Sequence, residues 1–96
     1  MTIEELKNIC DKLLCVTICR YYDYHVKTNY KNDNGDDCLY FNNYNMPEES
    51  VLIYNSYVIR YADIKKLYTN KDNEITIIYN DNGNECNMTF EPVYRS

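Results

Sequence analysis

The hydrophobic positions near the N-terminus follow a helical period. Apolar side chains recur every three or four residues over 3–14, with charged and amide side chains between them. Thr2 precedes this segment and Glu5 stands three residues later, which is the spacing of a capping box. The pattern predicts a helix over residues 3–14. Its end is weakly marked, because nothing in the sequence forbids the helix from continuing to Cys19.

The period then changes to two. From Val16 to Tyr30, β-branched and aromatic side chains occupy most even positions, and mostly polar side chains alternate with them. This alternation predicts a long strand. Arg20 interrupts the apolar face, so we expect a bend or a split near residues 19–21.

Two Asn-Gly pairs predict hairpin turns of type I′, which need positive φ at both central residues. A turn at Asn34-Gly35 sets Tyr30 opposite Leu39 and Thr28 opposite Phe41, with a return strand over residues 38–44. A turn at Asn82-Gly83 joins strands 74–79 and 85–90, and Pro92 is expected to end the second of these. Its predicted cross-strand pairs are Ile75 with Phe90, Ile77 with Met88 and Tyr79 with Cys86.

The middle of the chain is less decisive. Residues 45–50 include Pro47 and predict a loop, and residues 51–61 predict either one strand or a hairpin turning at Asn55-Ser56. Residues 62–68 fit a helical turn or a continuing strand. Together these elements predict an α+β fold in one small domain, residues 1–96. An N-terminal helix would pack on a twisted antiparallel sheet, or on a partly open barrel, of five to six strands.

The charge of the chain indicates which partners to expect. Its formal net charge is −5, whereas a protein that binds the phosphate backbone of nucleic acids is normally basic. We therefore expect no direct contact with a nucleic-acid backbone and no membrane association, since no apolar run approaches the ~20 residues of a membrane-spanning helix. A basic protein is the expected partner. Exposed strand edges also allow a homodimer, and the sequence does not choose between monomer and dimer.

The five cysteines predict a reducing compartment. Their odd number and irregular spacing do not match a disulfide framework, and the N-terminus is acidic where a secretory signal is basic. We expect a cytoplasmic protein. The chain has no C-x2-C pair and a single histidine, His25, so no zinc site is expected.

One short sequence occurs twice. Residues 32–35 and 80–83 both read Asn-Asp-Asn-Gly, but the two halves of the chain do not otherwise agree. We interpret the repeat as coincidence in an Asn-rich chain that needs hairpin turns. Neither copy places carboxylates at the first and last positions of an EF-hand loop, so calcium is not expected. No cofactor is predicted.

The sequence carries none of the common catalytic motifs. The sequence contains no phosphate-binding glycine loop, no nucleophile elbow and no H-E-x-x-H. Cys19 and His25 share a face of the predicted strand but lie about 20 Å apart along it. The chain is therefore predicted not to be an enzyme.

Tyrosines and acids supply the candidate surface. Twelve tyrosines exceed what the core of a chain this small needs, and tyrosine is favoured at protein interfaces. Acidic residues gather at the predicted turns and loop. We expect an acidic interaction protein that inhibits a nucleic-acid-handling partner, as phage or mobile-element anti-defence inhibitors and immunity proteins do. The candidate partner-binding residues are Asp33, Asp36, Asp37, Tyr40, Glu48, Glu49, Tyr57 and Tyr61. The three tyrosines among them are expected on the less apolar, exposed face of the sheet.

The alternative hypothesis is a small ligand-binding module. A pocket lined by tyrosines would hold a nucleotide-like or other aromatic molecule, and basic side chains would contact its phosphates. The candidates for those contacts are Arg20, Arg60, Lys65 and Lys66.

Overall fold

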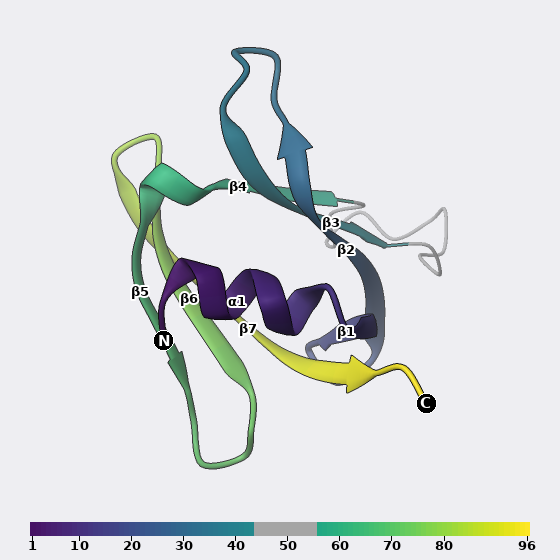
Figure 1. The fold of residues 1–96 in the computed structure, drawn as a ribbon. Helices are drawn as coiled ribbons and strands as arrows, with labels where there is room; N and C mark the ends of the chain where they lie inside the picture. The colour runs from purple at the N-terminus through teal and green to yellow at the C-terminus, as the bar shows by residue number, and fades with distance from the viewer. Residues whose placement is uncertain (44–55) are drawn as a thin grey trace.

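The computed structural model describes residues 1–43 and 56–96 (Figure 1). In these residues the fold is mostly β, with one short α-helix and seven antiparallel strands in one open sheet of order β4-β3-β2-β1-β7-β6-β5. The predicted α+β fold with five to six strands was therefore wrong. The elements are α1 Ile3–Cys10, β1 Leu13–Ile18, β2 Tyr22–Lys31, β3 Asp37–Asn43, β4 Ser56–Arg60, the 3₁₀ turn η1 Tyr61–Asp63, β5 Ile64–Thr69, β6 Ile75–Asp81 and β7 Asn84–Tyr94.

The helix begins as predicted and ends early. The Thr2 hydroxyl accepts from the Glu5 backbone N–H at 3.1 Å, and the Glu5 carboxylate accepts from the Thr2 N–H at 3.3 Å, which confirms the capping box. The chain leaves the helix after Cys10 and starts β1 at Leu13. Leu14 is 58% exposed, because in a strand it points away from the buried Leu13. Burial in the sheet overrides the helical period here.

No helix in the described part of the chain is long and apolar enough to cross a membrane.

The predicted break near residues 19–21 is confirmed. Cys19 and Arg20 have φ of 56° and 68°, and the chain reverses there. Ile18 pairs with Tyr22, so what looked like one long strand is the hairpin of β1 and β2.

The second Asn-Gly turn is as predicted. Asn82 and Gly83 both have positive φ, 51° and 85°, and all three predicted pairs between β6 and β7 are present. In contrast to the prediction, β7 continues through Pro92 to Tyr94. Because β6 begins at Ile75 opposite Phe90, the later part of β7 pairs with β1 alone, and Pro92 needs a strand neighbour on one side only.

The register predicted for the first Asn-Gly turn was wrong. Tyr30 pairs with Cys38 and Phe41 pairs with Val26, with an irregularity between Lys27 and Tyr30. The cause is the Asn32 side chain, whose Oδ1 accepts from the backbone N–H groups of Asn34 and Asp36 at 3.0 and 2.9 Å. These bonds close a wider loop than the type I′ turn would.

The segment predicted as either a helical turn or a strand contains both. One 3₁₀ turn, η1, is followed directly by β5. The predicted loop 45–50, Tyr44 and residues 51–55 lie outside the described residues.

The sheet curls so that side chains on its inner face pack against one another, even where their strands are not neighbours. Phe41 on β3 and Phe90 on β7 have ring centroids 5.6 Å apart, although β2 and β1 lie between these two strands in the sheet. On a flat sheet three spacings of about 4.8 Å would separate them by about 14 Å. The α1 helix lies across the concave side and contributes Leu6 and Cys10 to the same core (Figure 1). The apolar residues of that core are Leu6, Cys10, Leu13, Val16, Ile18, Tyr24, Leu39, Phe41, Ile59, Tyr61, Ile75, Ile77, Met88 and Phe90.

The β6–β7 turn supplies a test of the fold. Gly83 has φ of +85°, and nothing lies within 4 Å of the position that a Cβ would occupy. Gly83→Ala should therefore lower the free energy of unfolding through backbone strain alone, by about 1–2 kcal/mol. Urea denaturation measures the change. Gly83→Asn is the matched control, because Asn tolerates positive φ, and it should recover much of the loss. Equal losses in the two variants would contradict the strain explanation.

Candidate functional site

Two hairpin turns that are distant in sequence border one cleft. The cleft has a volume of about 590 Å³ and lies between the β2–β3 turn, the end of β4 with η1, and the β6–β7 turn. Both Asn-Asp-Asn-Gly segments contribute to it, which the sequence alone did not suggest. We call it the hairpin cleft. Its lining residues are Asn32, Asn34, Val58, Ile59, Arg60, Asp63, Tyr79, Asn80, Asp81, Asn82 and Gly83.

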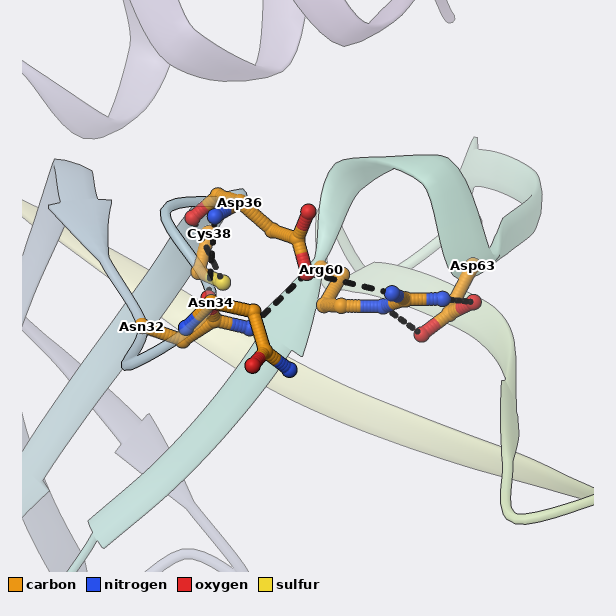
Figure 2. Close-up of polar contacts among 6 residues, drawn as sticks. All are labelled: Asn32, Asn34, Asp36, Cys38, Arg60 and Asp63. Carbon is orange, nitrogen blue, oxygen red and sulfur yellow. Dashed lines mark hydrogen bonds and ion pairs between the residues drawn. The ribbon is translucent and has the colours of Figure 1, made fainter.

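Arg60 joins two walls of this cleft (Figure 2). Its Nε and Nη2 donate to the two carboxylate oxygens of Asp63, each at 2.8 Å, and its Nη1 donates to Asp36 Oδ2 at 3.2 Å. Asn32 Nδ2 donates to that same Asp36 oxygen at 3.2 Å. The guanidinium thus connects the β2–β3 turn to η1, and the bidentate contact gives the pair a defined geometry.

The charge of Arg60 is therefore already balanced within the protein. Hydrogen bonding from the guanidinium holds the pKa of Asp63 below its usual 3.8, and the two carboxylates raise the pKa of Arg60. Of the described residues that line the cleft, Arg60 alone is basic. Asp81, on the opposite wall, is exposed and forms no ion pair with any described residue. To an incoming group the cleft consequently offers the Asp81 carboxylate and the side-chain amides of its asparagines, and the one cation among its described lining residues is already engaged.

The acidic candidates from the sequence have different surroundings. Asp36 belongs to the Arg60 network, and Asp33 is exposed at the β2–β3 turn. Asp37 forms an ion pair with Lys31, whose hydrogen bond lowers the pKa of Asp37. Glu48 and Glu49 lie outside the described residues.

Two of the three tyrosine candidates are not on the exposed sheet face where the sequence placed them. Tyr61 is only 8% exposed, and its hydroxyl donates to the Thr28 carbonyl at 2.6 Å. Tyr57 is half-buried on the inner face, 5.6 Å from the Tyr24 ring, and burial raises its pKa to about 12. These two placements were wrong because apolar burial, rather than alternation of residue types, determines which way the rings point. Tyr40 stays partly exposed.

The basic candidates do not come together. Arg20 lines a second cleft of about 400 Å³ with Tyr57 and Tyr79, away from Arg60. Lys65 lies 3.8 Å from Glu85, and Lys66 is exposed on β5. No two of these four residues share the hairpin cleft, the Arg20 cleft or the cavity between β4 and the β6–β7 hairpin.

The cysteines mostly belong to the core. Cys10, Cys15 and Cys38 are buried, and desolvation, with a smaller contribution from Asp11, raises the pKa of Cys10 to about 12. A thiol in that state is a poor nucleophile and a poor metal ligand. Within residues 1–43 and 56–96, no three His, Cys, Asp or Glu side chains are grouped so that they could hold a metal ion.

The sequence did not indicate Asp63 as a site residue, and it placed Asp81 among the acids of the second predicted turn without linking it to Arg60. The Arg60-x-x-Asp63 spacing could have indicated Asp63, because side chains three residues apart meet across a helical turn. The position of Asp81 across the cleft from Arg60 depends on the curl of the sheet, and no local signal encodes it.

No family model, no curated protein and no solved structure matches this chain. The geometry of the hairpin cleft is therefore the basis for the function proposed below.

The Arg60 bridge makes the stability depend on pH. The folded pKa of Asp63 lies below its unfolded value of 3.8, so the bridge stabilises the fold above that value and is lost as the pH falls through the folded pKa. Arg60→Met should lower the melting temperature by several degrees at neutral pH. The difference from wild type should close between roughly pH 5 and pH 2.

Lys66→Met is the matched control for this experiment. It removes one exposed positive charge from β5 that forms no ion pair with a described residue, so the melting temperature should change little. A difference between Arg60→Met and wild type that persists at low pH would show that the ion pairs are not its cause.

Proposed function

We propose that this chain is a non-catalytic, acidic interaction protein that docks on a basic surface of a protein partner through the hairpin cleft. One observation carries the proposal. Two turns rich in Asp and Asn converge on one cleft, whereas the one arginine among the cleft's described lining residues is held by Asp36 and Asp63.

The chemistry of the cleft supports a cationic partner group. Carboxylate and amide oxygens accept hydrogen bonds from guanidinium and ammonium groups, and such charge-assisted bonds are among the stronger ones in proteins. Asp33 and Asp81 are exposed at the two turns and available for such bonds. The net charge of −5 would also speed the encounter with a basic surface.

A nucleic-acid-handling protein is the class of partner that we propose. Such proteins carry basic surfaces that bind phosphate backbones. An acidic protein seated on that surface would exclude the nucleic acid and so act as an inhibitor, in the manner of anti-defence or immunity proteins. We place this activity in the cytoplasm, where the free thiols stay reduced.

The second candidate is binding of a small anionic or aromatic ligand. The cleft that Arg20 lines with Tyr57 and Tyr79 favours it, because it offers a cation beside two aromatic rings. The separation of Arg20 from the other basic candidates counts against a phosphate site, which usually needs several donors.

Binding of a fluorescent oligo-arginine peptide tests the proposed docking. Affinity should fall as salt increases. The double variant Asp33→Asn, Asp81→Asn should weaken binding several-fold, because it removes an exposed carboxylate from each of the two turns that border the cleft. Fluorescence anisotropy measures the affinity.

The matched control removes the same charge elsewhere. Asp72→Asn with Glu91→Gln neutralises two exposed carboxylates on the β5–β6 turn and on β7, neither of which lines the hairpin cleft. This variant should bind nearly as well as wild type. Equal weakening of both variants would contradict docking at the cleft, and a melting temperature raised by nucleotides instead would favour the ligand-binding alternative.

A further inference from the structure

The two edges of the sheet differ in how they are protected. Natural sheets discourage unwanted pairing at an edge with lysines, prolines or irregular register. The edge strand β5 has two of these features, Lys65 with Lys66 and a register shift between Ile64 and Lys66. That edge is poorly suited to accept another strand.

The other edge, β4, lacks such protection. It pairs with β3 in five consecutive positions without any shift, and its sequence contains neither lysine nor proline. Val58, at its centre, is 44% exposed. Its one charged residue, Arg60, is held by Asp36 and Asp63. No described strand pairs with the outer side of β4.

A groove follows this open edge. The hairpin cleft and an adjoining cavity of about 440 Å³ share Val58, Tyr79 and Asp81, and between them they contact every residue of β4. The opposite wall is the distal part of the β6–β7 hairpin, which contributes Tyr79, Asp81 and Cys86. A strand edge that no described strand covers thus faces a wall that carries Asp81, an exposed carboxylate without an ion pair to any described residue.

We propose that β4 binds an extended basic segment of the partner protein as an additional antiparallel or parallel strand of the sheet. This inference rests on the proposed function and specifies how the docking occurs. Backbone hydrogen bonds to β4 would supply affinity, and alternate side chains of the segment would supply specificity. Lysine or arginine side chains on one face reach Asp81, and their aliphatic stems pack on Val58 and Tyr79.

Charge favours a partner segment over a second copy of this chain. Each copy carries −5, and pairing two β4 edges would bring two acidic clefts together. β4 itself offers only Arg60 as a compensating cation, and that guanidinium is already engaged. A basic segment avoids the repulsion between two acidic clefts and brings its own cations.

Backbone methylation of a probe peptide tests strand addition. The probe alternates Lys and Val, and two derivatives carry N-methyl groups on all lysines or on all valines. Successive N–H groups of a strand point to opposite sides, so one derivative blocks the edge that faces β4 and the other blocks the edge that faces away. We expect one derivative to bind at least about tenfold more weakly than the unmethylated peptide, a loss of about 1.4 kcal/mol, while the other stays close to it.

Amide hydrogen exchange supplies a second measurement. Peptide binding should slow exchange at alternate residues of β4 and leave exchange in β5 unchanged. Asp81→Asn should lower the affinity for the peptide, whereas the control Asp72→Asn should not. Equal effects of the two methylation patterns, with oligo-arginine binding retained, would overturn strand addition and leave acidic docking intact. If the wild-type protein bound neither the oligo-arginine peptide nor the Lys-Val peptide, both proposals would be overturned. Protection of β4 that grows with protein concentration in the absence of peptide would identify a second copy as the occupant.

Discussion

The apolar face of the seven-stranded sheet is wider than its single eight-residue α-helix can cover. The rest of the described structure depends on this difference in size. The helix is about 12 Å long, whereas six strand spacings span about 29 Å, so the helix covers only part of the apolar face. The sheet removes the remainder from water by curling on itself. The contact between Phe41 and Phe90, from strands that are not neighbours, is the direct result.

The same curl creates the site. It carries the β6–β7 turn toward the end of β4, so that Asp81 and Arg60 border one cleft although they lie in different hairpins. Arg60 then links the β2–β3 turn to η1 through Asp36 and Asp63. A core formed for hydrophobic reasons thus places acidic turns together. The acids stay at the surface because burying an uncompensated carboxylate would cost far more than the core gains.

The two edge strands of the curled sheet, β4 and β5, also differ from each other. The chain passes from β4 through η1 into β5, so both edges of the sheet are joined by one short connection whose Tyr61 is anchored in the core. β5 carries the lysines and the irregular register, and β4 carries an exposed valine beside the acidic cleft. An edge that no described strand pairs with, next to an acidic wall, suits an extended basic ligand better than either feature would alone.

Features that depend only on residues close together in the chain could be predicted from the amino-acid sequence. The capping box of Thr2 and Glu5, the break at Cys19 and Arg20, and the register around Asn82-Gly83 follow from local backbone preferences, and all three were predicted correctly. Tertiary structure decided where helix gave way to strand after Cys10, how β7 tolerates Pro92, and the inward position of Tyr57 and Tyr61. It also decided that two distant turns share a cleft. These features depend on which strands become neighbours and on how far the sheet bends to bury its apolar face, and no short stretch of sequence encodes that bend.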